Sequence, residues 1–312
     1  MRSVMLTKLD TPIREAWNKW LSVTRQRCHI HYRLVGSDLN EHVDACFASA
    51  REAADRIVRD IRGVAPLRIL EVGCSVGFNC FALARLFPTA TVVGIEPDRE
   101  AAGVATAMAT QSMSSNVEFV VAAGENLPFR DAVFDLIVCH TVIEHVNDVP
   151  LVVQEMARVL SQSGAIHLEA PNYIWPREPH LEMWCIPLFG KRLMRLFAVL
   201  QGKGRFSTYL DHLQLVTPRR MQRLFDRNGL AWESHVRAKL SLAADGAQGV
   251  VKAYRNLGRA LRFMKRIHLS AYLMNAASAF GLYPSVMYTV RHRGAIPVPD
   301  DKSISQKYRN LM

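Results

Sequence analysis

The sequence predicts an α/β fold in which a mostly parallel, seven-stranded sheet carries helices on both faces. From about residue 67 onwards, short apolar runs alternate with helical stretches, and this alternation is typical of a parallel sheet. A glycine-rich turn follows the first run, as expected where a buried strand passes directly into a helix. With 312 residues, of which 49% are hydrophobic, the chain can bury the core of one large domain with insertions.

Residues 1–62 are expected to form a helical N-terminal segment that serves as a lid or cap. Ile13, Trp17 and Trp20 recur at helical spacing, and residues 41–62 are rich in alanine, arginine and acidic residues. No strand pattern precedes position 67. Residues 63–312 then form the main domain, with insertions expected at about 171–216 and 239–283.

Seven apolar runs give the expected strands, at 67–72, 91–95, 117–121, 134–139, 165–169, 231–236 and 285–291. Between them, helices are expected at 78–87, from 98 to about 110, and at 150–160. A further helix should open at Thr217-Pro218, because threonine caps a helix amino terminus well and proline fits the first helical position.

The formal charge of +11 is concentrated in two segments that contain no acidic residue. Residues 183–210 carry five basic residues and residues 246–299 carry eight, so the rest of the chain sums to −2 (11 − 13). Within the second segment, residues 250–268 have an apolar stripe and a basic stripe at helical spacing. Such a helix can lie on an anionic membrane or meet a phosphate-bearing acceptor, or it can pack on the domain with a solvated basic face.

The six cysteines are scattered, with neither a C-x-x-C pair nor a pairing rhythm, so they suggest neither a disulfide framework nor a zinc site. A reducing cytoplasm fits best. The first residues lack the apolar core of a signal peptide, and secretion is not expected. The uncharged run at 269–290 is interrupted by Asn275, serines and Pro284, so a membrane span is not expected either.

The turn at Gly73–Gly77 has two interpretations. Gly73-Cys74-Ser75-Val76-Gly77 matches the G-x-S-x-G elbow of serine hydrolases, but that elbow needs a sheet already built around it, and here only the first strand precedes it. The alternative is a glycine turn that lets a nucleotide-like ligand lie against backbone. A dehydrogenase fingerprint is incomplete, because the third glycine is missing. Glu96, which ends the second strand, can accept hydrogen bonds from both ribose hydroxyls.

Several separated blocks together resemble the class I S-adenosylmethionine-dependent methyltransferases, specifically the group that includes the ubiquinone-biosynthesis methyltransferases. The blocks are Ile69–Gly77, Gly94–Pro97, Glu125–Phe129, Phe134–Cys139, Ile143–Val146 and Pro171-Asn172. The resemblance covers roughly residues 66–172, with a looser echo at 212–230 and in the last strand. It implies a Rossmann-like fold, methyltransferase activity and S-adenosyl-L-methionine as cofactor.

The resemblance also implies the residues that hold this cofactor. Glu71 and the turn through Gly73, Cys74, Ser75 and Gly77 would face its methionine part, Glu96 its ribose, and Pro97 its adenine. The stretch Gly124, Glu125, Asn126 and Leu127 would flank the adenine edge, with His140 near the sulfonium. Ser75 replaces the usual middle glycine, which can tighten the approach. Ala123 stands where many members have an aspartate that contacts the adenine amino group.

Methyl transfer from a sulfonium needs alignment and water exclusion, and a hydroxyl acceptor also needs a base. His145, His180 and His212 are the candidate bases. Alternatively, Glu144 and His145 fix their loop, and the other two are surface or capping histidines. Some relatives hold a divalent metal on an E-x-x-E-H pattern, but Thr141 replaces the first glutamate here, so no metal site is expected.

The function expected is O-methylation of a hydroxyl on a small-molecule, saccharide or lipid-linked acceptor. The alternatives are a cofactor-binding partner or sensor without turnover and, with less support, an RNA methyltransferase, since no aromatic-basic RNA module is present. The protein is expected in the cytoplasm, with peripheral contact to an anionic membrane through the basic insertions.

Overall fold

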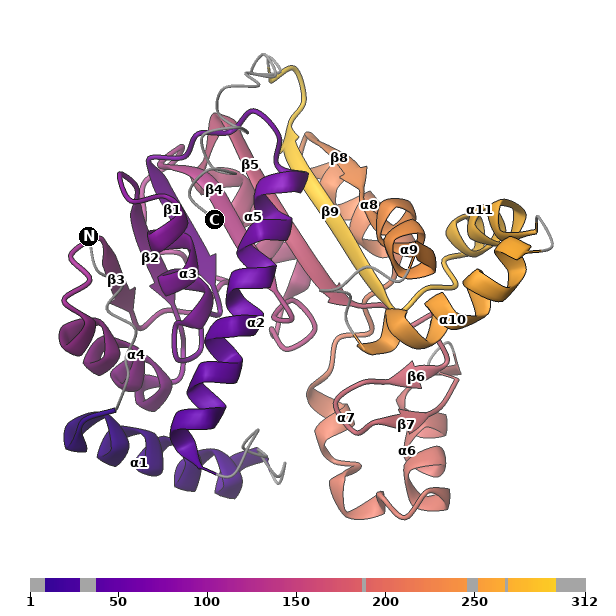
Figure 1. The fold of residues 1–312 in the computed structure, drawn as a ribbon, viewed down its shortest axis with the longest axis horizontal. Coiled ribbons are helices and arrows are strands. Elements are labelled where there is room, and N and C mark those ends of the chain that lie inside the picture. The colour runs from indigo at the N-terminus through magenta and orange to yellow at the C-terminus, as the bar shows by residue number, and fades with distance from the viewer. Residues whose placement is uncertain (1–8, 29–37, 187–188, 246–251, 267–268, 296–312) are drawn as a thin grey trace. The chain divides into compact units, whose positions relative to one another are not determined.

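The computed structural model describes residues 9–28, 38–186, 189–245, 252–266 and 269–295 (Figure 1). They fall into two compact units. Unit 1 comprises the residues up to Cys139, Pro150–His167 and those from Arg291 on, and unit 2 comprises His140–Val149 and Leu168–Val290.

Seven strands form one sheet in the order β3-β2-β1-β4-β5-β9-β8. Their bounds are β1 Arg68–Val72, β2 Thr91–Ile95, β3 Val117–Val120, β4 Phe134–His140, β5 Leu160–Pro171, β8 Leu230–Ser234 and β9 Ser285–His292. β1 pairs in parallel with β2 and β4, and β2 pairs in parallel with β3. The sheet is the expected mostly parallel, Rossmann-like sheet.

Unit 1 builds its core where apolar strands meet α2 (Leu39–Asp60) and α3 (Phe78–Leu86). β1 and β2 are buried after their first residue, because helices cover both faces of a parallel sheet. α4 (Arg99–Ser112) follows β2, and α5 (Val149–Val159) precedes β5. The amino end of α4 is capped by the Asp98 side chain, which accepts the Glu100 N–H at 2.9 Å.

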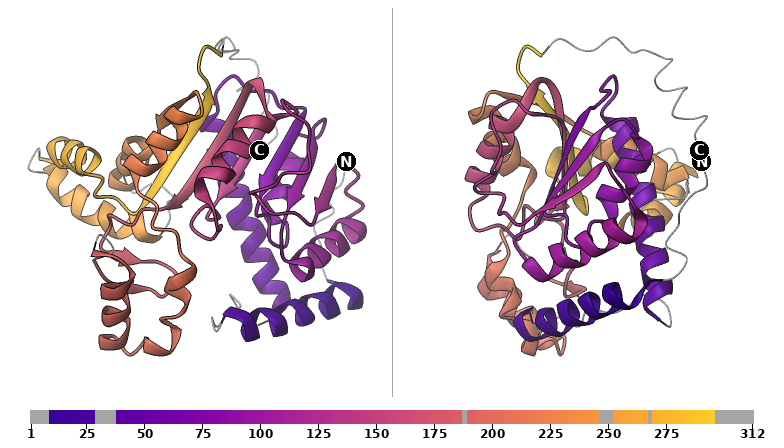
Figure 2. Two further views of the ribbon diagram at one scale, coloured as in Figure 1. Left: turned by 180° about the vertical axis from the view of Figure 1, so that it is seen from behind. Right: turned by 90° about the vertical axis from the view of Figure 1, so that its left-hand side faces the viewer.

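The N-terminal segment is helical, as expected, and packs into unit 1. α1 (Thr11–Cys28) lies next to α4, as Figure 2 shows, and its fully buried Trp17 packs against Phe78 of α3. Val76 of the glycine turn belongs to the same apolar cluster. The segment therefore supports the turn, and its role as a lid stays a prediction.

Unit 2 contains two groups of elements. The first runs through β6 (Arg177–Glu178), β7 (Met183–Trp184), α6 (Lys191–Leu200), the short 3-10 helix η2 (Gly204–Phe206) and α7 (Tyr209–His212). The second runs through α8 (Pro218–Arg227), α9 (Val236–Asp245), α10 (Lys252–Arg266) and α11 (Ser270–Phe280). Thr217 caps α8 as expected, accepting the Arg220 N–H at 3.3 Å.

Two expected strand boundaries were wrong. The strand expected at 231–236 is β8 at Leu230–Ser234, and α9 already begins at Val236, which is buried. β5 runs from Leu160 to Pro171, well beyond the expected 165–169, because polar residues 161–163 continue the strand. Among the described helices, none combines the length and apolar composition needed to cross a membrane. Val250 and His268, which belong to the expected basic helix, lie outside the described residues.

Candidate functional site

The glycine turn after β1 adopts left-handed backbone at three of its five residues. Gly73 has φ 69°, Ser75 φ 50° and Gly77 φ 85°. The turn is closed by a hydrogen bond from the Gly77 N–H to the Cys74 carbonyl at 2.8 Å. Left-handed backbone is accessible to glycine at little cost, whereas Ser75 pays a steric penalty of about 1 kcal/mol.

Glu96 lies directly beside this turn. The Ser75 N–H donates to Glu96 Oε2 at 2.9 Å, and the Asp98 N–H donates to Glu96 Oε1 at 3.0 Å. Each carboxylate oxygen has a second lone pair and can still accept a hydroxyl. Burial raises the pKa of Glu96 from its usual range. The end of β2 and the turn after β1 are thus joined by a hydrogen bond, and the carboxylate oxygens of Glu96 can each accept one more.

Glu71 lies inside the protein beneath the turn, at the end of β1. Its Oε1 accepts the Asn79 side-chain N–H at 2.8 Å, and its Oε2 accepts the Cys80 thiol at 2.9 Å. Burial raises the pKa of Glu71 to about 7. Glu71 therefore ties the end of β1 to the first turn of α3.

Phe119 of β3 closes the turn from the side. A Cβ at Gly77 would lie 2.5 Å from the Phe119 ring, and one at Gly94 would lie 2.8 Å from the same ring and 2.7 Å from Cys74 Sγ. Both glycines are required by this close approach as well as, at Gly77, by φ. The Phe119 ring therefore limits how closely the turn can approach β3.

The stretch from Gly124 to Leu127 is held by two residues of α5. Glu155 accepts the Leu127 N–H at 2.9 Å, while Arg158 donates to the Leu127 carbonyl at 3.1 Å and the Phe129 carbonyl at 2.8 Å. Leu127 is buried, and Asn126 is exposed. Glu155 and Arg158 of α5 thus fix the loop that the resemblance assigns to the adenine edge. The sequence analysis did not predict these two contacts.

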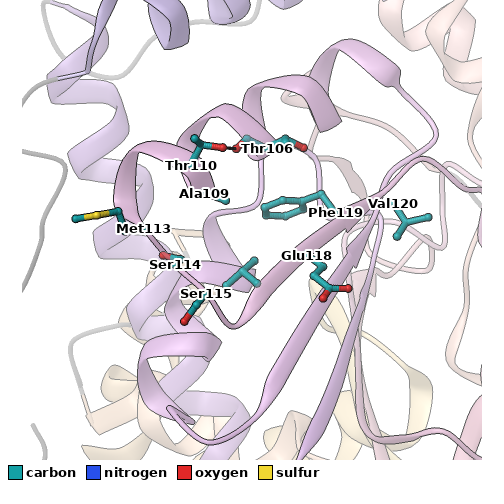
Figure 3. A pocket seen from close by; sticks show the side chains of 10 residues that line it. Thr106, Ala109, Thr110, Met113, Ser114, Ser115, Glu118, Phe119 and Val120 are labelled. Carbon is teal, nitrogen blue, oxygen red and sulfur yellow. Dashed lines mark hydrogen bonds between the residues drawn. The ribbon is translucent and has the colours of Figure 1, made fainter.

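A cavity of about 610 Å³ lies elsewhere in unit 1, between α4 and β3 (Figure 3). Its walls include Thr106, Met113 and Phe119, but none of Gly73–Gly77 or Glu96. Its lining extends over residues 113–115 and the whole of β3. Phe119 lines this cavity and also lies against Gly77, so the cavity adjoins the turn without including the predicted cofactor residues.

In unit 2, the chain leaves β4 through a strained residue. His140 ends β4 and is half-buried, and Thr141 follows with φ 53°. A β-branched residue in left-handed backbone is an outlier that surrounding contacts must maintain. Here the Thr141 N–H donates to the Glu169 carbonyl at 2.8 Å. This kink starts the short segment that carries Glu144 and His145.

Glu144, His145 and His180 form a compact cluster in unit 2. The Nε2 atoms of His145 and His180 are 3.2 Å apart. Glu144 Oε1 lies 3.7 Å from His145 Nε2 and 3.8 Å from His180 Nε2. Glu144 is completely buried, and neither of its carboxylate oxygens has a hydrogen-bond partner among the described residues. A buried carboxylate without partners is costly, which suggests that the cluster serves a function.

His180 is oriented by Glu178, which is fully buried. Glu178 Oε1 is 2.6 Å from His180 Nδ1 and also accepts the His180 N–H, while Oε2 accepts the Leu181 N–H at 2.5 Å. The Tyr209 ring lies 5.5 Å from the His180 ring and 6.0 Å from the His145 ring. His212, three residues after Tyr209, is exposed and takes no part in the described contacts of this cluster.

The pKa values within the cluster are displaced in different directions. Burial raises the pKa of Glu144 to about 7 and lowers the pKa of His145 to about 4. Burial alone would also lower the pKa of His180, but the hydrogen bond and charge of Glu178 and the charge of Glu144 outweigh it, so that pKa is raised. Three groups with displaced pKa values at one place are typical of acid–base sites, although structural networks can show them too.

The same three side chains fit the ligand set of a divalent cation. Around a tetrahedral ion with ligands at about 2.0–2.2 Å, neighbouring ligand atoms lie roughly 3.3–3.6 Å apart. The separations here are 3.2, 3.7 and 3.8 Å. Glu178 at His180 Nδ1 is the partner that metal-binding histidines usually have. The expectation of no metal site stays a prediction, and this cluster is the place to test it.

Sequence reasoning missed several residues of these arrangements, among them Glu155, Arg158, Glu178 and Tyr209. Glu155 and Arg158 form an (i, i+3) ion pair at 2.7 Å, which the spacing alone indicates. Glu178 lies two residues before His180, a spacing that was visible. Nothing in the sequence distinguishes Tyr209 from the other aromatic residues of the insertion expected at about 171–216.

Part of the chain is similar in sequence to known methyltransferases. Residues 70–168 match a family model described as a methyltransferase domain. A ubiquinone biosynthesis O-methyltransferase of Nitrobacter winogradskyi is 29% identical over 177 residues, covering 56% of this chain and 61% of the relative. A norajmaline N-methyltransferase of Rauvolfia serpentina is 28% identical over 146 residues, covering 44% and 49%. The chain therefore spans about half to three fifths of the length of these relatives.

Among solved structures, PKMT2 from Rickettsia typhi in complex with AdoHcy resembles the fold with a TM-score of 0.50 and 14% identity, covering 80% of this chain and 54% of that one. The matched family domain contains the glycine turn, Glu96 and the loop at 124–127. Residues 70–168 thus match a methyltransferase domain, and over this stretch the chain resembles the class I S-adenosylmethionine-dependent methyltransferases, whose cofactor is S-adenosylmethionine.

Proposed function

We propose that this protein transfers the methyl group of S-adenosylmethionine to a hydroxyl oxygen of a small-molecule, saccharide or lipid-linked acceptor. The relatives named above include both an O-methyltransferase and an N-methyltransferase, so the resemblance leaves the acceptor atom open. The observation that carries the proposal is the cluster of Glu144, His145 and His180, because an oxygen acceptor must lose a proton.

The cofactor would be held by unit 1. The backbone of Gly73–Gly77 would lie along its methionine part, the free lone pairs of Glu96 would accept its ribose hydroxyls, and Pro97 would lie beside the adenine. Glu125 and its neighbours would flank the adenine edge. These assignments are supported by the contact between Glu96 and the turn, with the Ser75 N–H 2.9 Å from Glu96 Oε2.

The reaction is an in-line displacement. An electron pair of the acceptor oxygen would form the bond to the methyl carbon as the carbon–sulfur bond breaks, and S-adenosylhomocysteine would be the leaving group. The hydroxyl proton would pass to the cluster of Glu144, His145 and His180. His145 is the most exposed of the three, and its Nε2 lies 3.7 Å from Glu144 Oε1. Because the three groups lie within 3.8 Å of one another, their charges interact and the proton would be shared by the cluster.

The test compares three histidine variants in a methyl-transfer assay with labelled cofactor and extracts containing lipids, saccharides or RNA. His145→Ala and His180→Ala should each lower kcat about 10²- to 10⁴-fold, as loss of a general base does. His212→Ala is the matched control and should keep the wild-type rate. S-adenosylhomocysteine affinity should stay unchanged in all three.

Full activity in the His145→Ala and His180→Ala variants would remove the proposal of a base in this cluster. Binding of S-adenosylhomocysteine without transfer to any fraction would instead identify a cofactor-binding sensor. Transfer only to RNA would reassign the acceptor class.

A second role for the cluster is favoured by the partnerless oxygens of Glu144. With a divalent cation bound to Glu144, His145 and His180, the site would polarise the acceptor hydroxyl and lower its pKa. Calorimetric titration of Zn²⁺ into chelator-treated protein tests this without any activity assay. We expect one site in the wild type, lost in Glu144→Gln and His180→Ala and kept in His212→Ala. Absence of binding to the wild type would exclude this role.

We also propose that the two acid-free segments give unit 2 peripheral contact with an anionic membrane. The first segment contains α6, whose Leu196, Val199 and Leu200 are exposed alongside Arg192. This combination suits a lipid-linked acceptor presented at a membrane surface.

A further inference from the structure

Several large apolar side chains of α11 in unit 2 are exposed. Tyr272 is 74% exposed, Phe280 72% and Leu273 40%, and Leu269 and Leu282 at its two ends are 46% and 45% exposed. The helix contains no charged residue. An exposed, contiguous apolar surface of this kind marks an interaction site. α11 therefore has an apolar face without a described partner inside unit 2.

Basic side chains lie on the neighbouring helix. α10 contacts both α9 and α11, and its Arg259, Arg262 and Lys265 are exposed. Arg262 donates to the Ala243 carbonyl at 3.0 Å, which leaves its charge uncompensated by any acid in that contact, whereas Lys265 pairs with Asp245 at 2.7 Å. Phe263 on the same helix is 63% exposed. The pair α10–α11 thus presents apolar side chains together with positive charge.

The positive charge distinguishes between two possible partners of this apolar face, a second copy of the chain and a lipid bilayer. In a symmetric dimer through this face, the basic residues of one copy would meet those of the other, and no acidic residue between 246 and 299 is present to compensate. An anionic bilayer supplies both an apolar interior and complementary charge. α11 is too short to span a bilayer, at 11 residues, but long enough to lie in the plane of the interface.

We infer that α11 is the membrane-inserting helix of this protein, with Tyr272, Leu273 and Phe280 entering the headgroup boundary of an anionic bilayer and the basic residues of α10 holding the lipid phosphates. This deepens the membrane contact proposed above and rests on it. It does not depend on which atom is methylated.

The experiment is co-sedimentation of the full chain with vesicles of phosphatidylcholine alone or mixed with phosphatidylglycerol. We expect binding to the mixed vesicles only, weakening as salt is added, because exposed charges are screened within about 10 Å at 0.1 M. Tyr272→Asp and Phe280→Asp should each weaken binding about tenfold or more, as expected from lost burial of one large apolar side chain. Arg259→Ala should weaken it about fivefold, equivalent to about 1 kcal/mol.

Met113→Asp is the matched control, because Met113 is 79% exposed but lies in unit 1 outside the acid-free segments. It should bind vesicles like the wild type. S-adenosylhomocysteine affinity and thermal stability, measured for every variant, separate loss of membrane binding from misfolding and from failure of the methyltransferase proposal.

Three results would overturn the inference. Wild-type protein could fail to bind the anionic vesicles, or bind pure phosphatidylcholine equally well. The α11 variants could bind as tightly as the Met113→Asp control. Finally, sedimentation equilibrium without lipid could show a wild-type dimer that Tyr272→Asp or Phe280→Asp converts to monomer, which would make the face a contact between copies.

Discussion

At the scale of single residues, the site depends on Ser75 in a conformation that glycine normally occupies. Its φ of 50° directs the backbone N–H at Glu96 Oε2, at a distance of 2.9 Å. The hydrogen bond to a charged acceptor contributes about 1.5–3 kcal/mol and exceeds the steric penalty of the left-handed backbone. Serine is thus tolerated at position 75 because the hydrogen bond to Glu96 outweighs the steric penalty of its backbone conformation.

Replacing Glu96 tests this contact directly. In Glu96→Ala, the N–H groups of Ser75 and Asp98 lose their acceptor and the cofactor loses its proposed ribose contact. We expect the affinity for S-adenosylhomocysteine, measured by calorimetry, to fall at least about tenfold, from the loss of one or more hydrogen bonds to a charged group. Glu100→Ala, in the first turn of α4, should keep wild-type affinity. Equal affinity in wild type and Glu96→Ala would contradict the ribose assignment.

Glu71 links the site to the pH dependence of stability. Its pKa is about 7 in the folded protein, above the usual value of 4.5, because the side chain is buried. Between these values the folded state binds more protons than the unfolded state, so the free energy of unfolding decreases as pH rises from about 4.5 to about 7. The contribution lost is of the order of 2–3 kcal/mol.

Glu71→Gln should abolish this component. Thermal unfolding of the wild type and Glu71→Gln at pH 5 and pH 8 should show a smaller difference between the two pH values in the variant. The amide still accepts the hydrogen bond from Asn79, so the local contacts are largely kept. An identical pH dependence in both proteins would mean that Glu71 is ionised in the folded state.

At the scale of elements, the turn between β1 and α3 is fixed by what packs around it. Val76 belongs to the apolar cluster formed by α1 and α4, and Phe119 of β3 lies against Gly77. A helix–strand connection of ordinary length thereby becomes a rigid surface. Rigidity of this kind reduces the entropy lost when a ligand binds.

Two glycines provide a matched test of this packing. Gly77→Ala places a methyl group 2.5 Å from the Phe119 ring at a φ of 85°, so it should destabilise the protein by about 2 kcal/mol or more and weaken cofactor binding. Gly103→Ala lies within α4 with no atom within 4 Å of the new Cβ, and should stabilise by about 0.5–1 kcal/mol. Chemical denaturation measures both. Equal stabilities would show that the turn has room to relax.

The elements differ in how well the sequence predicted them. β1, β2 and β4 were predicted because each is a short, largely buried apolar run, a pattern that local sequence carries. The contact between His145 and His180 was not, because it joins residues 35 apart through the β6–β7 hairpin, and nothing local specifies that pairing. His212 illustrates the same limit. It was as good a candidate as His180 by sequence, but the neighbouring Tyr209 is the side chain that contacts the cluster.

At the scale of the whole molecule, the proposed functions are divided between two compact units. The cofactor residues, apart from His140, belong to unit 1, while the proton-accepting cluster and the membrane-facing helices belong to unit 2. The basic charge follows the same division, since most of both acid-free segments falls within Leu168–Val290. In these proposals unit 1 would hold the cofactor and unit 2 would select the acceptor.

Hydrogen exchange can test this division. S-adenosylhomocysteine should slow amide exchange in residues 73–79, 95–98 and 123–127, because ligand binding stabilises the elements that it contacts. Anionic vesicles should slow exchange in α10 and α11 without affecting those three stretches. Protection of α10–α11 by S-adenosylhomocysteine alone, with none at the glycine turn, would contradict the assignment of roles to the units.

The hairpin from Arg177 to Trp184 carries both His180 and Glu178, the carboxylate that orients it, with only Pro179 between them. The proposed acid–base group and the carboxylate that orients it therefore lie on one short peptide. α6, which contributes no described contact to the cluster, could be varied without altering this peptide. A designer who wished to redirect the enzyme would keep these eight residues and vary the chain that surrounds them.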